Sequence, residues 1–217
     1  MPETMYSTDH EKRRRHVRLF SIGAVVAINL FILVRYVGLI RHRKIQPALA
    51  MWVLFTIAVA GSLVTYLSEA AHGPLDNILN TSDMVLVVSV TVAILLFGDK
   101  TSRFTRFDLG CLAAVAAILV FWAFTRQHAA AHLAIQAILV IAYFPVVRRI
   151  WKTDRNTEPF APWIAMLLAA ALALLSSKGV LATVYAARAV ACTSLLLLLM
   201  AHAQWRQRRG SAAASGE

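Results

Sequence analysis

Two charged residues lie inside long apolar stretches of this sequence. Asp83 opens DMVLVVSVTVAILL (83–96), and Arg188 opens RAVACTSLLLLLMA (188–201). Ionisable residues within apolar spans are costly, and they usually face a protein interior or a polar path. A carboxylate and a guanidinium that face each other could pair and neutralise one another. They could instead hold a charged group of a solute, or Asp83 could take up a proton.

Other polar side chains continue the same two stripes. Asn80 and Tyr185 each lie three residues before a charged residue, so they fall one helical turn away on the same face. Ser89 and Ser194 lie about two turns further along. The predicted substrate-binding residues are therefore Asp83, Arg188, Asn80, Tyr185, Ser89 and Ser194. The alternative is a structural salt bridge that locks two parts of the chain together.

Two residues are candidates for a gate or a hinge. Arg35 lies near the end of the first apolar stretch, where it could guard the mouth of a path. The alternative is that the aliphatic stem of Arg35 lies along the apolar helix and carries the charged group to the membrane interface. Pro145 should kink its helix near one end and could act as a hinge.

The remaining polar candidates favour packing over chemistry. Asn29 and Gln136 are expected to bond across helices, a contribution of about 1 kcal/mol each. His128 and His132 have the i, i+4 spacing of a metal pair, but no carboxylate accompanies them, which favours an interfacial pair. The prediction is that the chain holds no metal and no cofactor.

The apolar stretches themselves predict the elements that position these residues. The chain has 217 residues, of which 59% are hydrophobic and 15% charged, too little charge for a soluble domain. A membrane-spanning helix needs roughly 20 mostly apolar residues. Seven such stretches are present, at about 18–40, 48–69, 78–98, 107–125, 130–147, 160–177 and 180–202. The predicted fold is an all-α membrane protein with seven transmembrane helices.

Charge between the stretches predicts orientation. Thirteen Lys and Arg fall in alternate loops and the C-terminal tail, whereas the opposite loops hold only Arg126 and Lys178. The positive-inside rule then places the N-terminus outside and the C-terminus in the cytoplasm, in a bacterial plasma (inner) membrane. The tail over 1–17, together with Arg18, carries five basic residues against this trend. The net charge of +11 is attributed to the membrane surface and not to nucleic acid.

The chain also contains an internal repeat. RYVGLIRHRK followed by IQPALAMW matches YFPVVRRIWK followed by TDRNTEPFAPW, and each copy reaches a proline and then a tryptophan. Trp52 and Trp163 are expected at the membrane interface. Continued to the third helix of each unit, the match sets Asp83 opposite Arg188. Chance alignment of apolar runs is the alternative to this parallel 3+1+3 repeat.

The repeat divides the chain into five parts. A basic tail (1–17) precedes the first three-helix unit (18–98), and a linker helix (99–128) leads to the second unit (129–202). A basic and then flexible tail (203–217) follows.

The segment YFPVVRRIWKTDRNTEPFAPW resembles the PQ-loop signature, and the layout resembles the SWEET-like transporters. Neither copy keeps the glutamine: Val37-Gly38 and Pro145-Val146 stand where Pro-Gln is expected. The resemblance implies a solute site formed largely by the third and seventh helices. A sugar substrate does not follow from it.

These observations predict a small-solute transporter or facilitator that works by alternating access around a polar site between helices 3 and 7. Its expected partners are a small solute, charged or not, and membrane lipid, with homo-oligomerisation left open. A receptor, sensor or accessory subunit of the same fold is the alternative. An enzyme is not expected, because the chain lacks HExxH, GxSxG and P-loop motifs.

Overall fold

The protein was analysed as a computed structural model that describes residues 3–45, 47, 49–69, 72–98, 106–153 and 158–214. These residues form eight α-helices and one 3-10 turn, with no strand among them. The elements are α1 (Glu3–Arg41), α2 (Leu49–Leu67), η1 (Pro74–Asn77), α3 (Ile78–Phe97), α4 (Arg106–Thr125), α5 (His128–Ile141), α6 (Phe144–Thr153), α7 (Phe160–Ala173) and α8 (Gly179–Ala214). The prediction of an all-α chain is confirmed for the described residues.

Four helical segments are long and apolar enough to cross a membrane, by length and composition. They are Glu11–Arg41, Pro74–Phe97, Arg106–Thr125 and Gly179–Arg209. Shorter apolar helices lie over Met51–Leu67, His128–Ile141 and Phe160–Ala173. Large apolar side chains such as Phe20, Phe124 and Leu198 are mostly exposed, as expected for a surface that faces lipid. The chain is therefore an integral membrane protein.

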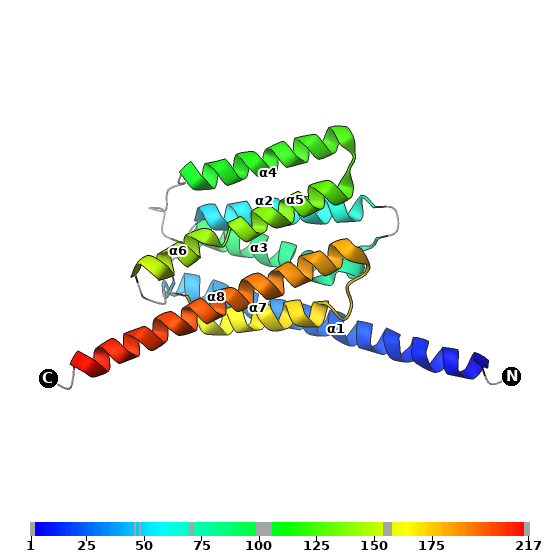
Figure 1. The fold of residues 1–217 in the computed structure, drawn as a ribbon, viewed down its shortest axis with the longest axis horizontal. Helices are drawn as coiled ribbons and strands as arrows, with labels where there is room; N and C mark the ends of the chain where they lie inside the picture. The colour runs from blue at the N-terminus through cyan, green and yellow to red at the C-terminus, as the bar shows by residue number, and fades with distance from the viewer. Residues whose placement is uncertain are drawn as a thin grey trace.

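The two ends of the chain are helical where the sequence predicted tails. α1 begins at Glu3 and runs for 39 residues, which is about 58 Å at 1.5 Å per residue. α8 runs for 36 residues and ends at Ala214. Glu, Lys, Arg, Gln and Ala dominate these extensions, and all are good helix formers. Figure 1 shows the two extensions leaving the bundle at opposite ends of its long axis.

The predicted fifth span is interrupted near Pro145. α5 ends at Ile141, residues Ala142 and Tyr143 form a turn, and α6 begins at Phe144. Pro145 is the second residue of α6, where its missing N–H costs nothing, whereas in a continuous helix it would break the bond to Ile141. The sequence predicted a kink at Pro145, and the structure has an interruption at Ala142–Tyr143, two residues before it.

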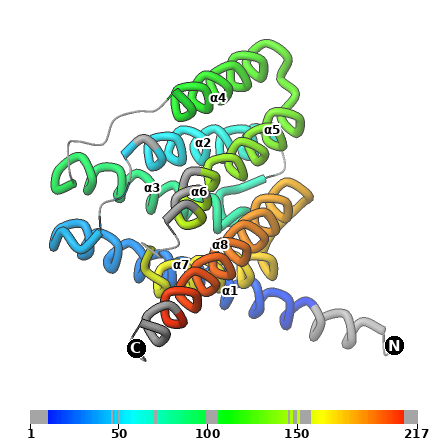
Figure 2. Tube along the Cα trace, turned by 60° about the vertical axis from the view of Figure 1, so that its left-hand side comes forward, coloured from blue at the N-terminus to red at the C-terminus, as the bar shows by residue number. Residues whose placement is uncertain are grey.

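The helices pack in two groups. In the first group α3 contacts both α1 and α2, and in the second α8 contacts both α5 and α7. The groups meet where α1 packs on α7 and where α2 packs on α5. α4 contacts only α5 and α2 among the larger contacts, and Figures 1 and 2 show it as an outer layer on one side of the bundle.

The centre of the bundle is apolar but contains a row of buried polar side chains. Most buried apolar residues belong to one continuous cluster that draws on all eight α-helices. Polar groups buried within it must find protein partners, because no water is available to replace lost hydrogen bonds. These polar residues include Asn29, Ser62, Asn80, His132, Gln136 and Thr193. Their partners define the candidate site.

Candidate functional site

A cavity of about 60 Å³ lies at the centre of the bundle, between the two helix groups. Asp83 of α3 and Arg188 of α8 both line it, together with Tyr185 of α8 and Asn29 of α1. Helices α2, α5 and α7 supply most of the remaining wall. The volume leaves room for a few water molecules and is far below the roughly 300–1,000 Å³ of pockets for drug-sized ligands. Three of the six predicted site residues therefore face one small, central space.

Asp83 is held by two neutral donors. The amide of Asn29 donates to its Oδ1 at 3.1 Å, and the hydroxyl of Tyr185 donates to its Oδ2 at 2.9 Å. Asn29 also donates to the hydroxyl of Ser82, which fixes the amide between α1 and α3. The carboxylate is thus oriented from two helices, and no described cation bonds to it.

Arg188 is held in a matching way. Its Nε donates to the side-chain carbonyl of Gln136 on α5 at 2.7 Å. Its guanidinium carbon lies 4.8 Å from the centre of the Tyr185 ring, a cation–π distance. Tyr185 precedes Arg188 by one helical turn, so the two side chains share a face of α8.

The direct salt bridge expected between Asp83 and Arg188 is absent: the structure records no ion pair or hydrogen bond between these two described residues. Tyr185 stands between them, with its hydroxyl on the carboxylate and its ring under the guanidinium. A direct pair was one of the arrangements that the sequence allowed, and it is not formed between these described residues. This geometry also departs from the alternative of a directly bonded lock.

Asn80, Ser89 and Ser194 lie outside the lining of this cavity. Asn80 is fully buried, and its amide lies 2.9 Å from the hydroxyl of Ser62 on α2. The same hydroxyl accepts a hydrogen bond from the Gln136 amide at 2.8 Å. Asn80 is therefore linked through Ser62 and Gln136 to Arg188 but does not face the cavity. Ser89 and Ser194 are only partly buried and are not brought together with the other site residues.

Two tryptophans that were predicted at the membrane interface line the cavity. Trp52 and Trp163 are 3% and 5% exposed, and their depth in the membrane stays a prediction. Ring contacts at 5.1–6.2 Å between centroids connect Tyr36, Trp52, Phe55, Tyr143 and Trp163 in order. This aromatic chain crosses from α1 and α2 to the α5–α6 turn and α7, and so joins the two helix groups below the charges.

The gate and metal candidates are placed as follows. Arg35 is exposed on α1 and does not line the cavity, as its interface alternative requires. His128 accepts a hydrogen bond from the Trp122 indole, whereas His132 is buried with its Nδ1 3.1 Å from the Ser62 carbonyl. Among the described residues, no group of three His, Cys, Asp or Glu side chains is close enough to hold a metal ion.

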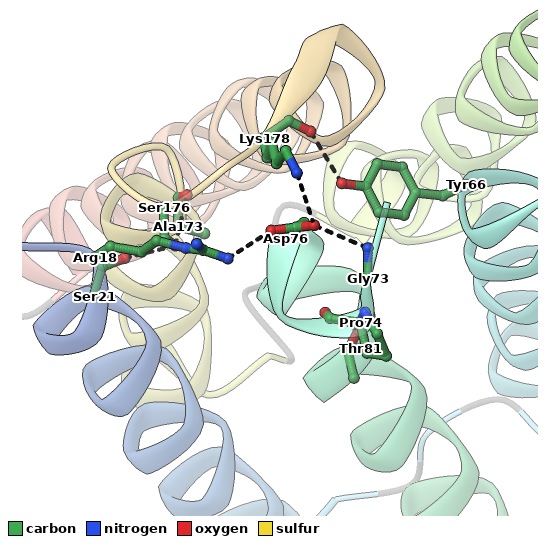
Figure 3. Close-up of polar contacts among 10 residues, drawn as sticks. All are labelled: Arg18, Ser21, Tyr66, Gly73, Pro74, Asp76, Thr81, Ala173, Ser176 and Lys178. Atoms are coloured by element: carbon green, nitrogen blue, oxygen red, sulfur yellow. Dashed lines mark hydrogen bonds and ion pairs between the residues drawn. The ribbon is translucent and has the colours of Figure 1, made fainter. Parts of the chain in front are cut away.

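A second charged cluster surrounds Asp76, which lies in η1. Arg18 of α1 forms an ion pair with its Oδ1 at 2.5 Å, and Lys178 of the α7–α8 loop lies 3.6 Å from its Oδ2 (Figure 3). The backbone N–H of Gly73 also donates to Oδ2, and the Lys178 N–H donates to the Asp76 carbonyl. Tyr66 completes the cluster by donating to the Lys178 carbonyl at 3.0 Å. Three segments far apart in sequence meet at one carboxylate.

The cavity can therefore offer a carboxylate and a guanidinium to one small molecule. Each charge is oriented by a neutral amide from the helix beside it, and the two are separated by one tyrosine. The sequence analysis assigned Asn29 and Gln136 to packing. In comparisons of the chain with known proteins, no family model, no curated protein and no solved structure matches it.

Proposed function

We propose that this chain is a small-solute transporter or facilitator that works by alternating access around the cavity between α3 and α8. The observation that carries the proposal is that one acid and one base, on different helix groups, face the same central cavity without bonding to each other. Charges left in that state inside a membrane protein usually mark a solute or ion pathway.

The packing of the helices supports a parallel 3+1+3 repeat. Replacing α1 by α5, α2 by α7 and α3 by α8 turns the contacts of the first group into those of the second. The same exchange turns the α1–α7 contact into the α5–α2 contact. Two equivalent groups related by an axis along the membrane normal can rock against each other about a site between them. α4 then serves as the linker.

The size of the cavity supports a closed state. At about 60 Å³ it has no room for a larger solute, and the aromatic chain from Tyr36 to Trp163 lies against one side of it. A solute would enter when the two groups separate at the α1–α7 and α2–α5 contacts. The turn at Ala142–Tyr143, next to Pro145, gives α5 and α6 a place to bend.

The resemblance to PQ-loop and SWEET-like proteins belongs to this proposal. So does the placement in a bacterial inner membrane with the N-terminus outside. Figure 1 supports an odd number of crossings, because α1 and α8 leave the bundle at opposite ends. Five basic residues near the N-terminus still oppose that orientation.

Transport into proteoliposomes tests the proposal. The purified chain is reconstituted, and uptake of labelled glycine, γ-aminobutyrate, methylamine, acetate and glucose is compared for wild type, Asp83→Asn and Arg188→Ala. We expect at least one solute to enter above the rate of protein-free vesicles, and both variants to slow it at least tenfold. Equal rates in wild type and both variants contradict the site. Protein-free rates for the whole panel contradict transport of these solute classes.

A receptor or accessory subunit is the second candidate, and the extension of α8 favours it. This helix continues beyond the bundle with an exposed Trp205, over which Arg209 lies at 3.8 Å from the ring centre. A projecting basic helix with an exposed indole could dock a partner. Affinity purification after mild detergent extraction discriminates: a stoichiometric partner that is lost on truncation at Ala203, without solute uptake, favours this candidate.

A further inference from the structure

We propose that the solute is a small zwitterion, with an ammonium group that binds Asp83 and a carboxylate that binds Arg188. The inference rests on the proposed function and assigns a substrate class to the same cavity. It requires that the two charges be available to a ligand, that their surroundings favour a ligand carrying both signs, and that the cavity admit only a small one.

The charges are available because neither neutralises the other. Tyr185 keeps them apart through its hydroxyl on Asp83 and its ring under Arg188. A carboxylate has about four acceptor positions, and the hydrogen bonds from Asn29 and Tyr185 use two of them. A guanidinium has five N–H donors, and Gln136 accepts the one on Nε. The Cys192 thiol also lies beside the guanidinium of Arg188. The terminal nitrogens have the fork geometry that binds a carboxylate through two parallel hydrogen bonds.

The charge balance of the wall favours a ligand with both signs. Asp83 and Arg188 are the ionisable acid and base among the described residues that line the cavity, so the wall has no net charge. A ligand that is only a cation would leave Arg188 without an ionic partner. A ligand that is only an anion would leave Asp83 without one. An unpaired charge in a low-dielectric interior is strongly unfavourable. A zwitterion satisfies both charges at once and adds no net charge to the membrane interior.

The neutral amides make the site directional. Asn29 donates to the acid, and Gln136 accepts from the base, so each amide supports one charge without cancelling it. These amides come from α1 and α5, the equivalent helices of the two groups. A zwitterion bound here would therefore bridge the two groups, with its ammonium on the first and its carboxylate on the second. Binding would couple directly to the contact between them.

The rest of the wall limits the size of the ligand. Trp52, Phe55, Trp163, Met166 and Ala169 provide apolar surface, and the cavity measures about 60 Å³. Beyond the two charges and their amide, the polar groups of the wall are few: the indole N–H of Trp52, which has no recorded partner among the described residues, and the hydroxyls of Tyr143, Tyr185 and Thr193. A short ω-amino acid, with only methylene groups between its charges, matches this wall best.

A series of ω-amino acids tests the inference. The full-length chain in lipid nanodiscs is titrated with glycine, β-alanine, γ-aminobutyrate and 5-aminovalerate, and with methylamine, acetate and glucose as controls. Thermal unfolding and calorimetry report binding. We expect one zwitterion to bind at least tenfold more tightly than methylamine, acetate or glucose, with an optimum at one charge spacing. Glucose, methylamine or acetate binding as tightly as every zwitterion would overturn the inference, as would no binding by any zwitterion.

Two variants assign the ends of the ligand. Asp83→Asn should reduce zwitterion affinity at least tenfold without weakening acetate binding, and Arg188→Gln should do the same without weakening methylamine binding. Glu11→Gln and Arg41→Gln are charge-matched controls, because both side chains are exposed outside the cavity, and they should change nothing. Unaltered zwitterion affinity in both site variants contradicts the assignment.

The outcome also separates this inference from the proposed function. Uptake of glucose or methylamine that depends on Asp83 would keep the transporter and reject the zwitterion. Zwitterion binding without uptake would keep the ligand class and reject transport. If the site variants fail to fold, the wild-type ligand series still decides the substrate class.

Discussion

The carboxylates of Asp76 and Asp83 lie only seven residues apart in the chain, yet their surroundings differ in kind. Asp76 bonds directly to two cations, Arg18 and Lys178, and to a backbone N–H. Asp83 accepts hydrogen bonds from an amide and a phenol, and Tyr185 separates it from Arg188, the base that lines the same cavity. In the first arrangement the charges form ion pairs that join distant segments, whereas in the second the two charges lie apart around a cavity.

This difference separates a structural lock from a candidate binding site. The Asp76 cluster ties α1, η1 and the α7–α8 loop together (Figure 3), and its Arg18 and Lys178 also line an open surface pocket of about 640 Å³. The Asp83 and Arg188 side chains line a cavity and rely on neutral neighbours. The lock that was considered for Asp83 and Arg188 describes the Asp76 cluster better. Substitutions in the two regions should therefore act on different properties.

Asp76→Asn should have the largest effect on stability. The substitution keeps the shape and the acceptor for Gly73 but removes both ion pairs, and its partners Arg18 and Lys178 are half exposed and can hydrate. We expect the free energy of unfolding to fall by about 2 kcal/mol, measured as a lower melting temperature in detergent. The uptake rate of the folded protein should be nearly unchanged. Glu11→Gln, an exposed acid on α1, is the control and should melt like wild type.

An unchanged melting temperature for Asp76→Asn would show that the cluster does not lock the fold. Loss of uptake at unchanged stability would show that Asp76 belongs to the solute path, and the comparison between the two regions would then fail.

Tyr185→Phe should act on binding more than on stability. Phenylalanine keeps the ring under Arg188 and removes the hydrogen bond to Asp83. A hydrogen bond to a charged group contributes about 1.5–3 kcal/mol, so zwitterion affinity should fall roughly tenfold or more. Titration of γ-aminobutyrate and melting are measured on the same nanodisc sample. If the melting temperature of Tyr185→Phe fell as much as that of Asp76→Asn while the affinity stayed unchanged, the Asp83 and Arg188 region would be a structural lock as well.

Gly179→Ala tests the lock through backbone geometry. Gly179 has φ +79°, where an alanine is strained, and an added Cβ would lie 3.0 Å from Nε2 of His72. We expect the free energy of unfolding to fall by about 1 kcal/mol, because the alanine would strain the backbone next to Lys178. Gly38→Ala is the matched control: its Cβ would meet open space in helix α1, so stability should hold or rise slightly. Equal melting of the two variants would show that the loop does not need this conformation.

Much of the fold follows from the apolar runs, because hydrocarbon requires helices of a known minimum length. The predicted starts and ends of α2, α3 and α4 lie within two residues of the observed ones. The tails were not predicted as helices because the end of an apolar run does not show how far a helix continues past the membrane. The good helix formers in the tails were the signal that could have predicted the helical extensions.

The site was predicted less completely, because depth in a span does not determine which way a side chain faces. Trp52 and Trp163 were predicted at the membrane interface from their sequence positions, and their side chains line the cavity. Asp83, Arg188 and Tyr185 were identified from the cost of charge in a span and from i, i+3 spacing. The Asp76 cluster was missed because its members, at positions 18, 76 and 178, are joined only by the packing of distant segments.

Arg35→Gln should have the smallest effect of all and sharpens the comparison between a charge in the site and a charge at the surface. Arg35 and Arg188 are both arginines inside apolar stretches, but Arg35 is exposed on α1 and absent from the cavity wall. Its aliphatic stem can reach the membrane interface, so its guanidinium can be solvated there, and no bond from it to another described residue is recorded. We expect uptake and zwitterion affinity within twofold of wild type, against at least tenfold losses for the Arg188 variants. A comparable loss at Arg35 would restore it as a gate and would mean that the solute path extends from the cavity to the face of α1.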